Sequence, residues 1–134
     1  MFFLNLKAST MRVTSDFFVT ALVRRIFAEA GFAAIQKKGS PEAGAIFIAV
    51  DRLDGTYDFY GPAPQAMFVE QPEGRLFEKV LSIVPREDIT ARLLKEARMD
   101  PDYWHVEIEA PGGKIDLPLA EDEPDKGPDL FFKR

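Results

Sequence analysis

Apolar residues recur every three to four positions between residues 15 and 30, which is the spacing of one face of an α-helix. Phe18, Leu22 and Ile26 form the centre of this stripe. Ser15 is a suitable N-cap, because its hydroxyl can accept a hydrogen bond from an early backbone amide. We therefore predict a first helix over 15–30 that packs on a sheet through this face.

Short apolar runs and turn-forming residues alternate after this helix, as in strands joined by loops. Residues 32–38 predict a short strand, and residues 39–44, which contain Gly and Pro, predict a loop. The continuous apolar run 45–50 predicts a strand at the centre of the sheet, covered on both faces.

An Asp-Gly turn signal at 54–55 predicts a hairpin directly after this central strand. A two-residue turn would place Asp51 opposite Asp58, and like charges facing each other across strands are destabilising. A three-residue loop pairs Arg52 with Thr56 instead. We predict this second register because it keeps the two carboxylates apart.

The second half of the chain contains further strand patterns and one helix pattern. Residues 66–70 and 75–81 flank a turn and predict a second hairpin, although the latter run could also begin a helix. Residues 86–99 have helical spacing. Residues 104–110 alternate strictly between apolar and polar positions, and residues 115–119 alternate again around a proline, which predicts an edge strand.

These segments predict an α+β fold, with two helices packed on one face of a mostly antiparallel sheet of about five or six strands. We expect a single domain over residues 11–119, preceded by an extension over 1–10 that is disordered or lies ahead of the true start at Met11. Residues 120–134 are acidic and predict a disordered tail.

Composition narrows the classes of function. The chain has 134 residues, which fits one domain, and no cysteine, which excludes disulfides, zinc–thiolate sites and thiol nucleophiles. No apolar run approaches the roughly 18–20 residues that span a bilayer, and the opening segment lacks the features of a signal peptide. We therefore expect a cytoplasmic protein without a membrane partner, and we assign no catalytic, cofactor-binding or metal-binding residue.

The net charge of −5 is unevenly distributed, because residues 1–40 carry six basic and only two acidic groups. Arg24, Arg25, Lys37 and Lys38 could form one basic patch for RNA, DNA or an acidic protein. The chain has no recognised nucleic-acid motif and is acidic overall, which argues against non-specific phosphate binding.

The only histidine, His105, is followed at alternate positions by Glu107 and Glu109. In a strand the first and last of these lie ~13 Å apart, too far to share one ion, so we interpret the three as a solvated face. If the last two strands form a hairpin, Glu109 faces Asp116, and the pair could hold a structural cation or form a dimer contact.

A group of large apolar residues lies close together near the prolines of positions 62 and 64. Such residues could line a small-molecule or peptide groove, although aromatic residues are more often core. The group comprises Tyr57, Phe59, Tyr60, Met67 and Phe68.

Four segments in order resemble a small alphaproteobacterial family, domain of unknown function 1491. They are MRVTSDFFVTALVRR, KKGSPEAGAIFI, DRLDGTYDFYGPAPQ and ARMDPDYWHVEIE, and with the residues between them they cover about three quarters of the chain. The resemblance implies a bacterial cytosolic protein and no particular activity. It offers no catalytic residues and implies that the position of His105 need not be histidine.

The sequence therefore favours a small non-enzymatic binding or assembly module, formed as a homodimer or with another protein partner. The opposite charge of the two regions, the expected edge strand and the apolar Leu-Phe-Phe near the C-terminus motivate this prediction. The alternative is a small-molecule-binding protein or enzyme with a pocket near residues 57–68. Nucleic-acid binding through the basic patch ranks third.

Overall fold

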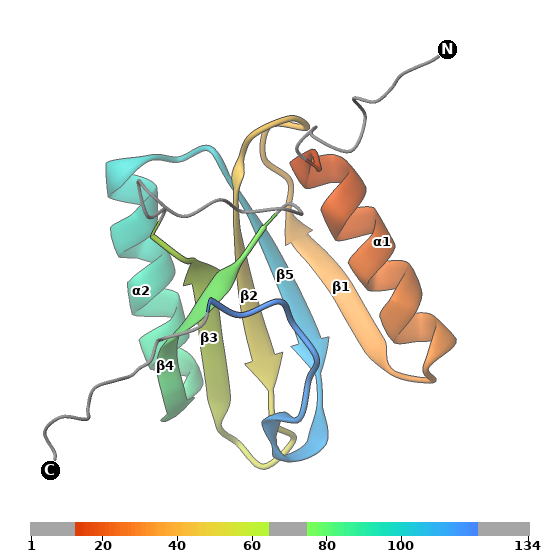
Figure 1. Cartoon of the computed structure of the whole chain (residues 1–134). Coiled ribbons are helices and arrows are strands. Elements are labelled where there is room, and N and C mark those ends of the chain that lie inside the picture. Colours follow the sequence, from red (N-terminus) through yellow and green to blue (C-terminus); the bar gives the residue numbers. More distant parts are fainter. Residues whose placement is uncertain (1–12, 65–74, 121–134) are drawn as a thin grey trace, which may run out of the picture.

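The computed structural model describes residues 13–64 and 75–120. Within these two ranges the chain forms two α-helices, one five-stranded sheet and a short 3₁₀ turn (Figure 1). The elements are α1 (Ser15–Ala28), β1 (Phe32–Lys37), β2 (Ala45–Asp51), β3 (Tyr57–Pro62), β4 (Phe77–Val84), α2 (Arg86–Met99), β5 (Tyr103–Glu109) and η1 (Pro111–Gly113). The predicted α+β fold is confirmed.

The strands lie in the order β1-β5-β2-β3-β4, and only the β2–β5 pair is parallel. The sheet is therefore mixed but mostly antiparallel. The predicted sixth strand over 115–119 is wrong, because β1 and β2 already occupy both sides of β5. After η1 the chain instead crosses a face of the sheet and makes one isolated bridge, from Leu119 to Phe77 at the far edge.

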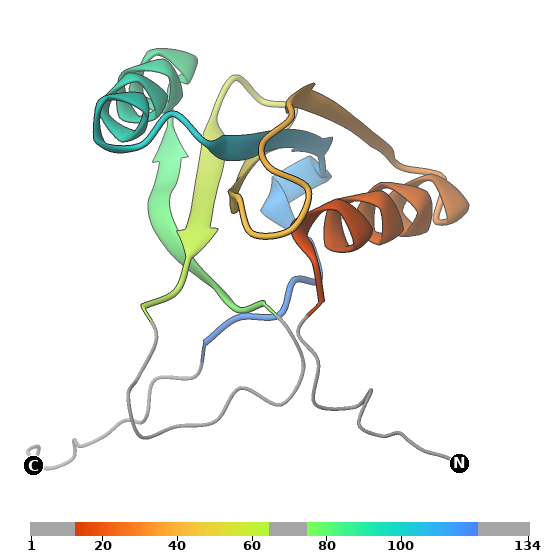
Figure 2. The same ribbon diagram turned by 90° about the horizontal axis from the view of Figure 1, so that it is seen from above.

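The two helices cover opposite faces of the sheet, as Figure 2 shows, so the prediction of both on one face is wrong. Alternate residues of β2 explain this arrangement. Ile46 and Ile48 belong to the cluster that packs against α1, whereas Phe47 and Ala49 belong to the cluster that packs against α2. The continuous apolar run 45–50 is the sequence signal for this double burial, and its central position is confirmed.

The N-terminus of α1 is capped by Thr14, one residue earlier than predicted, through a hydrogen bond from the Phe17 amide to its hydroxyl. Ser15 is buried, and its hydroxyl donates to the carbonyl of Gly44 over 2.6 Å. The loop over 39–44 therefore holds the start of α1.

The β2–β3 hairpin has the predicted three-residue loop, since the Arg52 amide donates to the Thr56 carbonyl over 3.0 Å. Asp51 consequently lies opposite Tyr57. The other predicted hairpin partner, residues 66–70, lies outside the described residues, and β4 pairs with β3. Neither helix in the described ranges has the length and apolarity needed to cross a bilayer.

Candidate functional site

Large apolar side chains are exposed along the side of the molecule formed by α1 and β1. The exposed fractions are 66% for Phe17, 51% for Phe27, 47% for Phe32 and 38% for Ile35. The rings of Phe27 and Phe32 are in edge-to-face contact, with centroids 5.8 Å apart. We call Phe27, Phe32 and Ile35 the edge surface, because Phe32 and Ile35 belong to the edge strand β1 and Phe27 contacts Phe32. Phe32 and Ile35 flank the same strand edge from opposite faces of the sheet.

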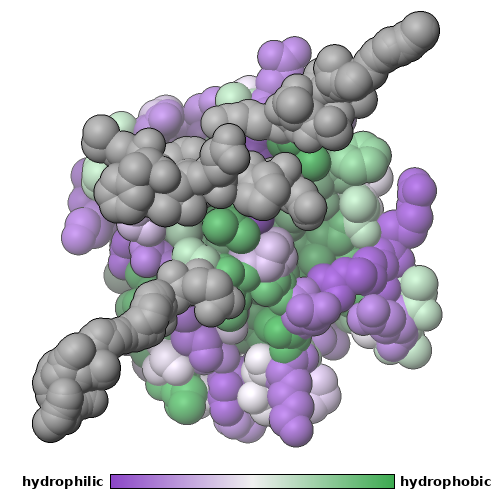
Figure 3. All heavy atoms as spheres, in the orientation of Figure 1, coloured by the Kyte–Doolittle hydropathy of each residue, from purple (hydrophilic) through white to green (hydrophobic). Residues whose placement is uncertain are grey.

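Strand β1 is the first strand of the sheet and pairs only with β5 in the described part of the chain. Its second edge therefore presents backbone groups without a strand partner there, which is the property that lets an edge strand accept another chain. On the face shown in Figure 3, hydrophobic residues also gather over the first turns of α1. Exposed apolar surface next to an open strand edge is typical of an interaction site.

The two ends of β1 carry opposite charge. Lys38 follows its C-terminal end, is exposed and makes no hydrogen bond or ion pair within the described residues. Glu29 precedes its N-terminal end and lies 3.8 Å from Arg25, with 61% of its side chain exposed. The open edge of β1 therefore has a positive charge near its C-terminal end and a negative charge near its N-terminal end.

Two of the four basic residues of the predicted patch form hydrogen bonds to backbone carbonyls of the chain itself. Arg25 donates to the carbonyl of Asp116 over 2.6 Å. Lys37 donates to the carbonyls of Pro101 and Tyr103 and lies over the Tyr103 ring. Only Arg24 and Lys38 remain without such contacts in the described part of the chain.

The aromatic residues of the predicted groove are divided between the two faces of the sheet. Phe59 is buried in the cluster under α2, and Tyr60 is buried in the cluster under α1. Met67 and Phe68 lie outside the described residues. Tyr57 is half-buried, and its hydroxyl accepts a hydrogen bond from Arg86 over 2.9 Å. The described members of this group are therefore used for packing.

His105 is half-buried on the α2 face of the sheet, not on a solvated face as predicted, because β1 and β2 flank its strand. Its Nε2 is buried and has no hydrogen-bond partner among the described residues. Burial lowers the pKa of His105, the carboxylate of Glu107 opposes this, and the cation of Arg86 adds to it. The imidazole is thus held in its neutral form at neutral pH.

Glu107 is bound by Arg86, whose Nη2 lies 2.7 Å from Oε2. This hydrogen bond is the main cause that raises the pKa of Arg86. The same guanidinium lies over the Tyr57 ring, 4.5 Å from its centroid. Arg86 therefore joins the first turn of α2 to β5 and β3.

The predicted hairpin that would oppose Glu109 and Asp116 does not form, since Glu109 lies opposite Phe32 on one side and Asp51 on the other. Both residues nevertheless belong to the lining of one groove beside the C-terminal half of α1. Within the described ranges, no group of three or more His, Asp or Glu side chains is arranged to hold a metal ion.

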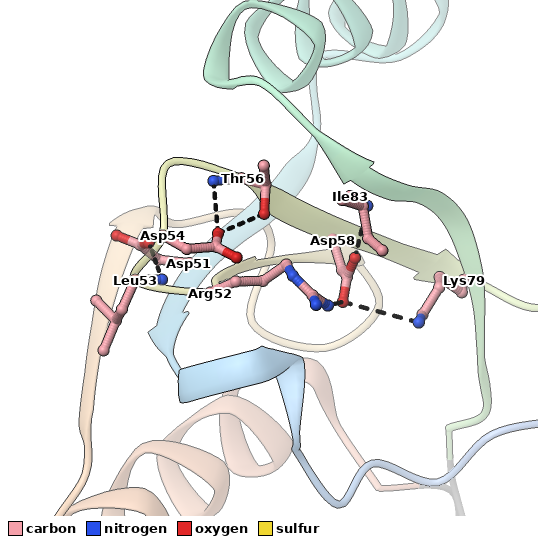
Figure 4. A network of polar contacts seen from close by, with 8 residues as sticks. All are labelled: Asp51, Arg52, Leu53, Asp54, Thr56, Asp58, Lys79 and Ile83. Atoms are coloured by element: carbon pink, nitrogen blue, oxygen red, sulfur yellow. Dashed lines mark hydrogen bonds and ion pairs between the residues drawn. The ribbon is translucent and has the colours of Figure 1, made fainter.

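The carboxylate of Asp58 binds two cations and a backbone amide, a cluster that the sequence analysis did not predict. Asp58 is fully buried and lies 3.0 Å from Nη1 of Arg52 and 3.7 Å from Nζ of Lys79. Its other oxygen accepts from the Ile83 amide over 2.8 Å (Figure 4). The opposite charges of Arg52 and Asp58, on the two sides of the hairpin, could have predicted this ion pair from the sequence.

Comparison with solved structures places this fold among those of bacterial proteins. A solution structure from A. tumefaciens is 44% identical in sequence, covering 84% of this chain and 98% of that one with a TM-score of 0.73. A crystal structure of a DUF1491 family protein from Caulobacter crescentus is 31% identical, covering 83% of this chain and 100% of that one with a TM-score of 0.65. No curated protein matches the chain.

The family model described as protein of unknown function (DUF1491) matches residues 13–117. These residues include every helix and strand described above. The resemblance found in the sequence segments is thereby confirmed, and the chain belongs to the DUF1491 family.

Proposed function

We propose that this protein is a non-enzymatic binding and assembly module that forms a homodimer through the edge surface and β1. The observation that carries the proposal is the exposure of Phe27, Phe32 and Ile35 beside an edge strand with no second partner in the described chain. Apolar residues in such a position are costly to leave in water and favour strand addition. The proposal includes the cytoplasmic location expected from the sequence.

A second copy of the chain fits this edge by symmetry. Two β1 strands can pair antiparallel around a two-fold axis through their middle, so that one surface serves both copies. This pairing brings Lys38 at the end of one strand near Glu29 at the start of the other, twice per dimer. The charge polarity of the edge therefore favours the antiparallel arrangement over a parallel one.

The strength of dimerisation can be estimated from the apolar area that the edge surface exposes. Fully burying a large apolar side chain contributes about 1.5–3 kcal/mol, and the three side chains are each about half exposed. Six such side chains contribute at most about 5–9 kcal/mol, when the dimer buries them completely, which is similar to the ~4–15 kcal/mol cost of association. Hydrogen bonds between the strands add to this, so we expect a weak, concentration-dependent dimer.

Sedimentation velocity from low to high micromolar concentration tests the proposal. The wild-type protein should convert from monomer to dimer, and the Phe27→Ser/Phe32→Ser variant should remain monomeric. Leu94→Ser is the matched control, because Leu94 is an exposed apolar residue on α2, away from the edge. A wild-type monomer throughout, or equal dimerisation of the Phe27→Ser/Phe32→Ser variant, would contradict the proposed homodimer.

The other two functions receive less support from the geometry. A pocket near residues 57–68 would need Phe59 and Tyr60 on one surface, and they face opposite sides of the sheet. Nucleic-acid binding through the basic patch would need Arg25 and Lys37, which already bind backbone carbonyls of the chain itself.

A further inference from the structure

A shallow groove of about 480 Å³ lies on the outer side of α1, and we call it the α1 groove. The ring of Phe17 stands at one end and is 66% exposed. Ala21 and Ala28 follow it on the same side of the helix, and both are exposed. A large ring beside small side chains leaves room for apolar groups from another segment. The lining residues are Phe17, Thr20, Ala21, Arg24, Arg25 and Ala28.

A second groove, of about 410 Å³, connects the α1 groove with the segment that follows η1. The two grooves share Ala21 and Arg25, and the second adds Phe18 from α1 and Pro118 from that segment. The segment runs over the same face of the sheet as α1 (Figure 2). The described part of the chain then ends at Ala120, so the residues that follow start beside this surface.

The position of Ala120 is fixed close to α1. Its amide donates to the carbonyl of Phe77 over 2.9 Å, and the ring centroids of Phe77 and Phe18 are 5.5 Å apart. Leu130 follows ten residues after Ala120, a length of chain that spans up to about 33 Å. Helix α1 has 14 residues and is about 21 Å long. Residues 130–132 can therefore reach every part of the α1 groove.

The sequence after Ala120 complements the α1 groove in charge and in apolarity. Positions 121–129 contain five acidic residues and one lysine, and positions 130–132 are Leu-Phe-Phe. Arg24 is exposed and makes no hydrogen bond or ion pair within the described residues. Its cation is therefore available to the acidic run, while Phe17 and Ala21 offer an apolar surface to the Leu-Phe-Phe sequence.

Another segment of the chain has the same three apolar residues, since positions 2–4 are Phe-Phe-Leu. The charged residues between these positions and α1 are Lys7 and Arg12, which have the same sign as Arg24. Like charges repel, so charge disfavours this segment in the α1 groove and favours residues 121–134.

We propose that residues 121–134 dock on the α1 groove of the same chain. Leu130, Phe131 and Phe132 cover Phe17 and the alanines beside it, and the acidic run lies near the unpaired cation of the groove. Because segment and groove are joined by a short stretch of chain, their effective concentration is in the millimolar range, and weak contacts suffice. A partner that binds this side of α1 must displace the segment. The proposed homodimer uses a different surface, β1 and the edge surface.

The amide signals of the ¹⁵N-labelled full chain test the proposal. In the Leu130→Ser/Phe131→Ser/Phe132→Ser variant, the signals of Thr20 and Ala21 should move, because aromatic rings no longer lie beside them. The signals of α2 should stay in place. A peptide with the sequence of residues 121–134, added to this variant, should move the signals back toward their wild-type positions. Adding Arg24→Gln to the variant should weaken binding of the peptide about twofold to fivefold, as expected for exposed ion pairs.

Phe2→Ser/Phe3→Ser/Leu4→Ser is the matched control, because it removes the same residue types from the basic segment. It should leave the signals of the α1 groove unchanged. In the Phe27→Ser/Phe32→Ser background, which removes the edge surface, these signals should be the same at about 0.05 mM and about 0.5 mM protein.

Three results would overturn the proposal. The first is that the C-terminal serine variant leaves the signals of the α1 groove unchanged. The second is that the N-terminal control moves them as far, which would assign the groove to residues 2–4. The third is that their positions depend on protein concentration in the background without the edge surface, which would assign the groove to a second copy of the chain.

Discussion

At the scale of single residues, Trp104 joins β5 to the loop over 39–44. It is 2% exposed, and its indole Nε1 donates to the carbonyl of Ser40 over 2.9 Å. A Cβ at Gly39 or Gly44 would lie within 3.0 Å of its ring. The loop that holds the start of α1 is therefore folded tightly around the indole.

Replacing this residue should lower stability strongly. Trp104→Ala removes a buried aromatic ring and should decrease the free energy of unfolding by about 3–5 kcal/mol. Trp104→Phe keeps most of the packing and loses the hydrogen bond to Ser40, so it should cost less. Urea unfolding followed by circular dichroism measures both, and an alanine variant as stable as wild type would show that the indole is dispensable.

His105 provides a residue-scale prediction about pH. Its pKa is lowered in the folded state, because burial disfavours the imidazolium, so its stabilising contribution is complete above the unfolded pKa of ~6.5. As the pH falls below ~6.5, the unfolded state binds the proton first and stability decreases until the folded pKa is passed.

Comparing the pH dependence of stability in the wild type and in His105→Gln separates the titration of the imidazole from that of the carboxylates. Urea unfolding at about pH 7.5 and about pH 5.5 should show a larger loss for the wild type than for the variant. Equal losses in the two proteins would mean that the imidazole titrates alike in the folded and unfolded states.

At the scale of elements, the β2–β3 hairpin is joined to β4 through Asp58. Lys79 and the Ile83 amide reach this carboxylate from β4, and Arg52 reaches it from the hairpin. Gly113 packs on the same group, since a Cβ there would lie 2.6 Å from the Asp58 carboxylate. One buried charge thus organises three segments that are distant in sequence.

Removing this charge should destabilise the protein more than removing one of its partners. Asp58→Asn leaves the half-buried Arg52 without its counterion and should cost about 3–5 kcal/mol. Lys79→Met is the comparison, because the Lys79 side chain is 41% exposed and its contact longer, so its loss should be about 1 kcal/mol or less. Thermal and urea unfolding rank the two variants, and the reverse order would exclude Asp58 as the centre of the network.

Local patterns predicted most elements but not their partners. The spacing of apolar residues placed both helices, and charge repulsion between Asp51 and Asp58 selected the hairpin register that the structure has. Alternation over 115–119 predicted a strand that does not form. Whether an alternating segment joins a sheet depends on a free strand edge, and both edges of β5 are occupied.

At the scale of the whole molecule, the proposed dimer makes the charge polarity of β1 testable. Lys38→Glu should weaken the dimer about threefold to tenfold, since two exposed ion pairs become repulsive. Adding Glu29→Lys to this variant should restore dimerisation, because the charges are exchanged between the two ends of the strand. Sedimentation at low salt measures the three proteins, and the absence of restoration would exclude the antiparallel arrangement.

The helices, most strands, the hairpin loop and the family could be predicted from the amino-acid sequence, because each depends on residues close together in the chain or on an ordered set of segments. Three features became visible only in the folded chain: β5 lies between β1 and β2, α1 and α2 cover opposite faces, and Asp58 binds cations from two segments. Contacts between distant segments depend on which strand edges and faces remain open as the chain folds, and a local pattern does not contain that information.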